Sequence, residues 1–141
     1  MVRHQPASIC AGAPSGSPGF FHRATDPWVS CSADGTAAYS ISDSFNANEP
    51  RFGGTSAILI SRSTDGGNRW QTPVTARLDP SVTFLNDKES ITRDPLVANN
   101  GYAVWDQLVA PQKNANPSAT RHAFAFRGPT LFSRTTDKGM T

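Results

Sequence analysis

The sequence contains 141 residues, of which 37% are hydrophobic and 17% charged, and its formal net charge at neutral pH is +2. This composition is typical of a globular domain and gives no support to a disordered chain. Lys and Arg are scattered, so we expect no nucleic-acid partner, and no run approaches the about 18 apolar residues of a membrane-spanning helix.

The few cysteines and histidines predict neither a metal site nor a disulfide framework. Cys10 and Cys31 are the only cysteines; they could pair in an oxidising compartment, but we favour two free thiols. His4, His22 and His122 lie far apart without ligand spacing, so we expect no bound metal and no cofactor. No signal peptide is recognisable, so the sequence does not indicate the cellular compartment of the protein.

The first nineteen residues are rich in Ala, Ser, Gly and Pro and have no hydrophobic period. This composition predicts a flexible lead-in over residues 1–19, with ordered structure from Phe20. From there, short β-prone runs alternate with turn signals, and no window has the 3.6-residue period of an amphipathic helix. We therefore expect an all-β chain with almost no helix.

The first four β-prone runs predict a four-stranded antiparallel meander, which forms a first unit over about residues 20–80. The turn between the first two runs contains Asp34 and Gly35, a pair typical of hairpins. A longer polar loop then leads to the third run. The predicted strands are 27–32, 37–42, 57–63 and 70–76.

The same pattern returns in the second half of the chain. The Asp-Pro dipeptide at 94–95 repeats the one at 26–27 with an offset of 68 residues, and predicts the start of the second unit's first strand. Residues 131–137 resemble residues 59–65 with an offset of 72. Four strands per unit at a period near 70 are typical of propeller blades. We expect an incomplete second unit over about residues 86–141.

The most specific motif is S-x-D-x-G-x-x-W, formed by Ser63, Asp65, Gly67 and Trp70. The hydroxyl and the carboxylate can accept hydrogen bonds from N–H groups of a turn, and glycine adopts positive φ at little cost. The tryptophan offers a large ring to the interior. The first part of the motif recurs at Thr135, Asp137 and Gly139.

These residues resemble those of the Asp-box, or bacterial neuraminidase repeat, proteins, and within them the bacterial sialidase-like group. The resemblance covers about residues 20–141. It implies about two blades of a six-bladed β-propeller, in which each Asp box joins the third and fourth strands of a blade, away from the active site. It also implies a glycan partner such as a sialoglycoconjugate, and an exported parent protein that hydrolyses terminal sialic acid or a related glycoside.

The resemblance makes Arg23 a candidate substrate-binding residue. In the family, an arginine of an Arg-Ile-Pro motif before the first strand binds the substrate carboxylate, which a guanidinium can do bidentately. Here Ala24 and Thr25 replace the Ile and Pro of that motif. The alternative is a solvated arginine.

The resemblance also points to two aspartates. Asp43 stands where the family has its acid/base catalyst, after the second strand of the first blade; a general acid there needs a pKa raised by burial or by a neighbouring carboxylate. The alternative is an aspartate that caps a loop. Asp87, in the cluster 86–89 expected just before the second unit's first strand, is a candidate substrate-binding residue or part of a solvated charge run. Arg93 and Asp94 are expected to order the turn that begins this unit.

The nucleophile expected from the family is a tyrosine activated by a glutamate, both from later blades. Tyr39 and Tyr102 are the only tyrosines, and both fall at equivalent places in predicted strands, where an aromatic ring packs. We therefore expect this chain to be inactive alone. Two alternatives stay open: a non-catalytic Asp-box propeller that binds glycan or protein, and another Asp-box glycosidase with paired carboxylates.

Overall fold

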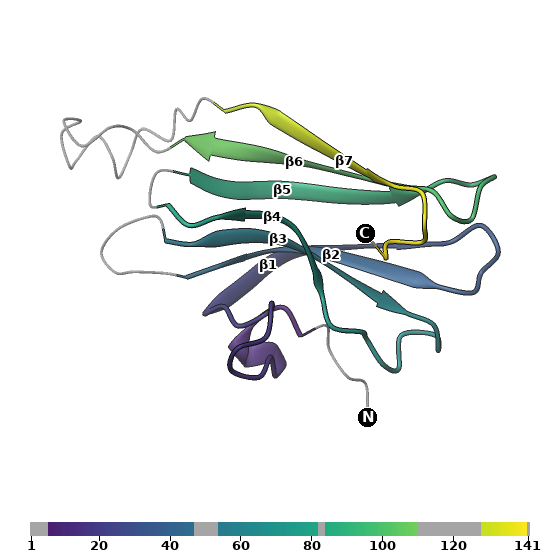
Figure 1. Ribbon diagram of the computed structural model, residues 1–141, viewed down its shortest axis with the longest axis horizontal. Coiled ribbons are helices and arrows are strands. Elements are labelled where there is room, and N and C mark those ends of the chain that lie inside the picture. The colour runs from purple at the N-terminus through teal and green to yellow at the C-terminus, as the bar shows by residue number, and fades with distance from the viewer. Residues whose placement is uncertain (1–5, 47–53, 82–83, 110–127, 141) are drawn as a thin grey trace.

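The computed structural model describes residues 6–46, 54–81, 84–109 and 128–140 (Figure 1). These residues form two antiparallel β-sheets and one short 3-10 helix, η1 (Ile9–Ala11). The prediction of an all-β chain is therefore confirmed. Within these ranges no helix has the length and apolar character needed to cross a membrane.

The first sheet, sheet 1, is the predicted four-stranded antiparallel meander, with its strands in sequence order. Its strands are β1 (Arg23–Cys31), β2 (Ala38–Phe45), β3 (Ser56–Ser63) and β4 (Val74–Asp79). The prediction that the fourth strand starts at Trp70 is wrong. The turn after β3 extends further, and Pro73, which has no N–H to donate to a ladder, directly precedes the strand.

The second sheet, sheet 2, has three strands in sequence order: β5 (Phe84–Arg93), β6 (Gly101–Val109) and β7 (Thr130–Thr135). The prediction that Asp94 and Pro95 begin its first strand is wrong, because they follow β5. Asp94 Oδ1 accepts hydrogen bonds from the N–H groups of Leu96 and Val97, both at 2.9 Å. Asp94 therefore orders a turn, but this turn joins β5 to β6 and does not begin the second unit as predicted. Asp87 lies inside β5.

The strand pairing defines which positions of the two sheets are equivalent. Tyr39 of β2 and Tyr102 of β6 occupy the same position, because Tyr39 pairs with Ser30 and Arg62 while Tyr102 pairs with Thr92 and Arg134. The first, second and third strands therefore repeat at offsets of 62, 63 and 72 residues. The predicted offset of 72 is confirmed, and the offset of 68 is replaced by 62.

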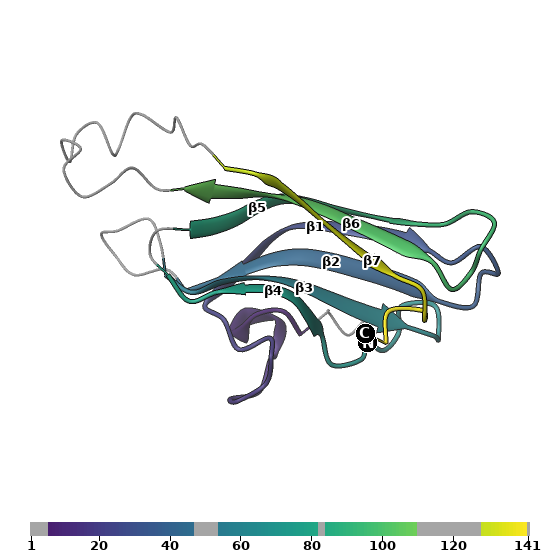
Figure 2. The same ribbon diagram turned by 45° about the horizontal axis from the view of Figure 1, so that its top comes forward.

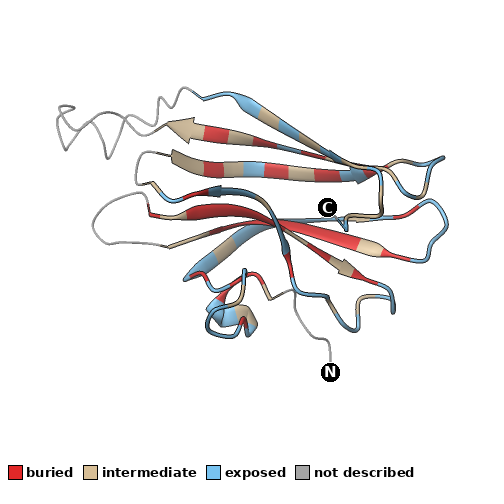
Figure 3. Ribbon diagram, in the orientation of Figure 1, coloured by how far each residue is buried: buried red, intermediate tan, exposed pale blue. Residues whose placement is uncertain are grey.

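The two sheets pack face to face, with β5 against all four strands of sheet 1 (Figure 2). Sheet 1 contributes Tyr39, Ile41 and Ile58 to the shared core. Sheet 2 contributes Ile91, Ala103 and Trp105. Burial follows this arrangement: β2 is almost entirely buried, whereas β7 is buried nowhere (Figure 3).

Both sheets face the same way in this stack. Sheet 1 turns the face that carries Tyr39 and Ile41 toward sheet 2. The equivalent face of sheet 2 carries Tyr102 and Val104, and it points away from sheet 1, because Ala103 and Trp105 are the residues that enter the core. Sheet 2 thus covers sheet 1 with its opposite face, as consecutive copies do in a repeating stack.

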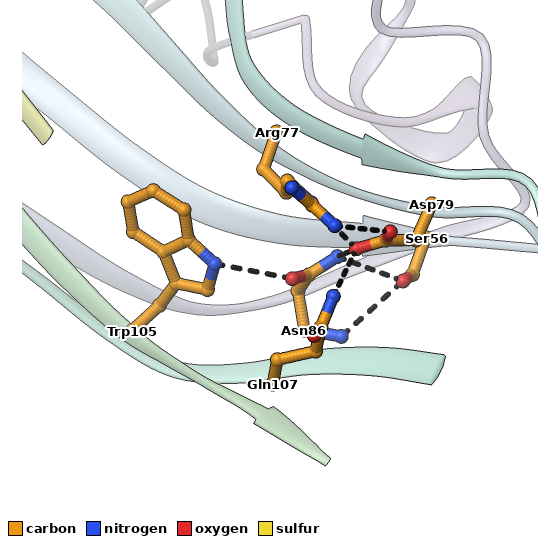
Figure 4. A network of polar contacts seen from close by, with 6 residues as sticks. All are labelled: Ser56, Arg77, Asp79, Asn86, Trp105 and Gln107. Atoms are coloured by element: carbon orange, nitrogen blue, oxygen red, sulfur yellow. Dashed lines mark hydrogen bonds and ion pairs between the residues drawn. The ribbon is translucent and has the colours of Figure 1, made fainter. Parts of the chain in front are cut away.

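A buried polar network joins the two sheets at one edge of the core (Figure 4). Asp79 Oδ2 accepts hydrogen bonds from Asn86 Nδ2 at 3.0 Å, Gln107 Nε2 at 2.8 Å and Arg77 Nε at 2.9 Å. Asn86 Oδ1 in turn accepts one from Trp105 Nε1 at 3.1 Å. Since β4, β5 and β6 all contribute, the network fixes the position of sheet 2 on sheet 1.

The described part of the predicted flexible lead-in makes defined contacts with the other face of sheet 1. Ala7 and Phe21 pack against Ala57 and Leu59 of β3, and Ser44 Oγ donates a hydrogen bond of 2.9 Å to the carbonyl of Ala7. Residues before and after η1 therefore cover part of the sheet surface that sheet 2 leaves open. The two cysteines are exposed free thiols.

Candidate functional site

Acidic side chains gather where β1, β2 and β5 meet, and two of them are buried. Asp43 of β2 is 3% exposed and Glu89 of β5 is 5% exposed. The backbone N–H of Asp43 donates a hydrogen bond to Glu89 Oε1 at 2.8 Å. With Asp26 and Asp87 nearby, these residues form what we call the carboxylate site.

Matching β-bulges in β1 and β5 create this site. Each first strand has a one-residue bulge, and the bulged residues adopt positive φ: 48° at Asp26 and 55° at Lys88. Lys88 Nζ pairs with the Asp26 carboxylate at 2.9 Å and with Asp87 at 3.6 Å. A bulge shifts the alternation of side chains along a strand. The bulge at Lys88 therefore places Glu89 against Asp43 although Glu89 comes only two residues after Asp87.

Burial raises the pKa of Asp43, and the charges of Asp87 and Asp26 raise it further, whereas hydrogen bonds from Thr25 oppose the increase. Thr25 donates to Asp43 Oδ1 from its hydroxyl at 2.7 Å and from its backbone N–H at 3.2 Å. Asp43 lies inside β2, so it does not cap a loop. Its surroundings meet the condition expected for a general acid, namely burial beside other carboxylates.

Glu89 has the most perturbed carboxyl group of the site. Burial raises the pKa of Glu89 to about 7, and the charge of Asp43 adds to the increase. Its Oε2 atom has no hydrogen-bond partner in the part of the chain that the structure describes. Near neutral pH this carboxyl group therefore exists in both protonation states, as an acid/base group must.

The remaining predicted residues lie around this pair. Arg23 is the first residue of β1 and is exposed; it lies two positions before Thr25, hence on the same side of the sheet as Asp43. Asp87 is half-buried and pairs with Lys88. The structure thus brings Asp43 and Asp87 together and places Arg23 at the adjoining end of β1.

Neither tyrosine lies at the carboxylate site. Tyr39, at the start of β2, is 1% exposed, and its ring lies under the guanidinium of Arg93 at 4.0 Å. Tyr102 donates a hydrogen bond from its hydroxyl to Asp94 Oδ2 at 3.0 Å. Both rings pack, which was the role expected for them.

The S-x-D-x-G turn after β3 and its shorter copy after β7 have matching hydrogen bonds; we call them the first and second Asp turns. In the first, Ser63 Oγ accepts from Gly67 N–H at 2.9 Å, and Asp65 Oδ1 accepts from Arg69 N–H at 2.8 Å. In the second, Thr135 Oγ1 accepts from Gly139 N–H at 2.9 Å, and Asp137 Oδ1 from Met140 N–H at 3.0 Å. Gly67 and Gly139 have φ of 86° and 74°.

These turns lie at the opposite end of the sheets from the carboxylate site. Asp43 is near the C-terminal end of β2, whereas the first Asp turn follows the C-terminal end of the antiparallel β3. A related turn after β1 adds to that end, where Ser32 Oγ accepts from Ala37 N–H and Asp34 Oδ1 from Thr36 N–H, both at 3.0 Å. The two ends therefore have different chemistry.

Among the described residues, no group of three or more His, Cys, Asp or Glu side chains has an arrangement that could hold a metal ion. The carboxyl groups of Asp43 and Glu89 can transfer protons and accept hydrogen bonds. In the comparisons with known proteins, no family model and no curated protein matches this sequence.

Proposed function

We propose that this chain forms two blades of an Asp-box β-propeller, the second blade incomplete, and that the assembled propeller hydrolyses terminal sialic acid or a related glycoside. The observation that carries this proposal is the buried pair of Asp43 and Glu89 at the end of the sheets opposite the Asp turns. Hydrolysis of a glycosidic bond needs a carboxyl group that holds a proton near neutral pH, and this pair provides one.

The stacking of the sheets supports the propeller. Both sheets face the same way, so the outer face of sheet 2, with Tyr102, Val104 and Phe132, is equivalent to a face that sheet 2 itself covers in sheet 1. A contact of this head-to-tail kind can be repeated, and it closes into a ring when the rotation between units allows it. Further blades would cover the outer face of sheet 2.

Each residue of the site has a role in this proposal. Asp43 transfers the proton to the leaving oxygen, and Glu89 keeps that proton available, because two adjacent buried carboxyl groups do not ionise together. Arg23, exposed at the start of β1, pairs with the carboxylate of the substrate. A nucleophile would come from other blades, because Tyr39 and Tyr102 are both packed away from the site.

A second candidate is a propeller that binds glycan or protein without catalysis. Two hydrogen bonds from Thr25 hold Asp43 Oδ1, and Lys88 pairs with two of the surrounding carboxylates. Such contacts also suit a purely structural cluster that fixes the bulges. The departure of Ala24 and Thr25 from the Arg-Ile-Pro motif favours this candidate as well.

The experiment is turnover of a fluorogenic sialoside by this chain and by the full protein encoded by its open reading frame. We expect no turnover by this chain alone. In the full protein, Asp43→Asn should lower kcat by about 10²–10⁴-fold, the usual contribution of a general acid. The matched variant Asp106→Asn, at the equivalent position of sheet 2, should leave kcat unchanged.

The outcomes separate the candidates. A full protein that binds sialosides but hydrolyses none, with or without Asp43, would support the non-catalytic propeller. Turnover of other glycosides only, lost in both Asp43→Asn and Glu89→Gln, would support a glycosidase with paired carboxylates. Equal kcat in wild type and Asp43→Asn would exclude the proposed role of Asp43.

A further inference from the structure

A cavity of about 200 Å³ lies between the two sheets, at the end that carries the Asp turns. Sheet 1 contributes Tyr39, Ile60 and Ala76 to its walls, and sheet 2 contributes Ile91, Arg93 and Ala103. Most of the wall is therefore apolar, with a few polar groups, which is the usual character of a small-molecule site. Its volume suits a ligand smaller than a typical drug molecule.

Arg93 brings a buried positive charge to this cavity. The residue is 4% exposed, and Gly101 makes room for it, because a Cβ at Gly101 would overlap Arg93 Nη1. Arg93 Nη2 donates to the carbonyl of Ala98 at 2.7 Å, but Nε has no hydrogen-bond partner in the described ranges. Burial lowers the pKa of Arg93, and the neighbouring charge of Arg62 acts in the same direction. Burial without a paired anion is costly for a guanidinium.

No described acidic side chain lines the cavity, although Arg134 does so together with Arg93. The two acids whose charges reach Arg93 are Asp34 and Asp94. Asp34 is bound in its own turn and pairs with Lys138 at 3.4 Å. Asp94 accepts hydrogen bonds from its loop and from Tyr102. Among the described residues, the cavity wall therefore carries two arginines and no acidic side chain.

A second polar group of the cavity lining, contributed by sheet 1, also lacks a hydrogen-bond partner. The hydroxyl of Tyr39 is buried and makes no hydrogen bond to any residue described. Buried polar atoms almost always have a partner, so two such atoms on residues that line one cavity indicate a ligand that accepts hydrogen bonds. A carboxylate accepts from both a guanidinium and a hydroxyl.

We propose that this cavity binds a small organic carboxylate, with its carboxylate on Arg93 and Tyr39 and its apolar body against Ile60, Ile91 and Ala103. The site lies at the end of the sheets away from Asp43 and Glu89. It is therefore independent of the proposed glycoside hydrolysis. Its ligand class is an aryl or branched alkyl acid, because the rest of the wall offers apolar contacts.

The test is a titration of the isotope-labelled chain with benzoate, followed by NMR of the isoleucine methyl groups. We expect saturable shifts at Ile60 and Ile91, and at least about 10-fold weaker binding of benzamide, which has the same shape without the charge. Arg93→Met should weaken benzoate binding by about 10- to 100-fold, as loss of a charge-assisted hydrogen bond does. Arg69→Met, which removes an exposed arginine of the first Asp turn, should not change it.

Tyr39→Phe keeps the test decisive if Arg93→Met fails to fold. This variant removes only the hydroxyl, and we expect about 2- to 10-fold weaker benzoate binding with little change in the far-ultraviolet spectrum. Several results would overturn the proposal: no saturable shift with benzoate, shifts that avoid Ile60 and Ile91, or equal affinity for benzamide. Affinity unchanged in both Tyr39→Phe and a folded Arg93→Met would overturn it as well.

Discussion

The two sheets present the same face in two different situations. In sheet 1, Ile41 is 0% exposed because sheet 2 covers it, whereas Val104, its equivalent in sheet 2, is 39% exposed. The aspartates two positions further along differ in the same way: Asp43 is buried beside Glu89, while Asp106 is half-buried and accepts a hydrogen bond of 2.8 Å from Thr130.

This difference shows that the neighbouring sheet, and not the strand position, makes the carboxylate site. Asp43 and Asp106 occupy equivalent positions opposite the residue that precedes a bulge. Only Asp43 meets the first strand of a following sheet, which supplies Glu89 and Lys88. A third sheet placed on sheet 2 in the same way would bury Asp106 in turn.

We expect the largest loss of stability from a substitution in the polar network that connects the two sheets. Asp79→Ala removes the acceptor shared by Arg77, Asn86 and Gln107 and leaves two buried amides without it. We expect a loss of about 3–5 kcal/mol in the free energy of unfolding, measured by urea denaturation. Asp106→Ala, an aspartate of the uncovered face, should cost less than about 1 kcal/mol. Equal losses would show that the network does not hold the sheets together.

The next largest loss of stability is expected when the covered face of sheet 1 is compared with the uncovered face of sheet 2. Ile41→Ala leaves a cavity between the sheets, and we expect a loss of about 2–4 kcal/mol. Val104→Ala, at the equivalent position, removes a partly exposed side chain and should cost less than about 1 kcal/mol. Urea denaturation of the two variants measures the difference. Similar losses would mean that the outer face of sheet 2 is covered in solution.

Much of this fold could be predicted from local patterns. The order of the four strands of sheet 1 and the turn at Ser63 and Asp65 follow from alternating apolar residues and from turn chemistry, although the fourth strand starts at Val74 and not at Trp70. The Asp-Pro dipeptide at 94–95 misled the prediction, because it resembles the dipeptide at 26–27 yet ends a strand where the earlier one sits in a bulge. Sequence similarity over so few residues cannot separate these two uses of Asp-Pro.

The candidate site could be predicted only in part. The resemblance points to Asp43, although the structure places it inside β2 and not after that strand. Glu89 was not singled out, because its contact with Asp43 depends on a bulge at Lys88 and on the packing of β5 across sheet 1. A lysine at positive φ gives no signal in the sequence. The burial of Arg93, whose Nε has no hydrogen-bond partner among the described residues, depends likewise on the packing of the two sheets.

A smaller effect is expected in the pH dependence of stability, which tests the carboxylate site. The pKa of Glu89, about 7 in the folded chain, lies above its ordinary value of 4.5, so the folded state binds the proton more tightly. Stability from this group is therefore complete below about pH 4.5 and is lost as the pH rises through 7. We expect about 1–3 kcal/mol lower stability at pH 8 than at pH 5. Glu89→Gln should flatten the dependence of stability on pH, and Asp106→Asn should not. Equal stability of the wild-type chain at pH 5 and pH 8 would contradict the prediction.

The smallest expected effect compares the two Asp turns. Ser63 Oγ accepts from Gly67 N–H and donates to Asp65, and Thr135 does the same for Gly139 and Asp137. Ser63 is 1% exposed, so its truncation removes a buried hydroxyl together with its hydrogen bonds, whereas Thr135 is half-buried. By urea denaturation, Ser63→Ala should cost about 1–2 kcal/mol and Thr135→Ala about half of that. A larger loss for Thr135→Ala would mean that sheet 2 depends on its turn more than the sheet it covers.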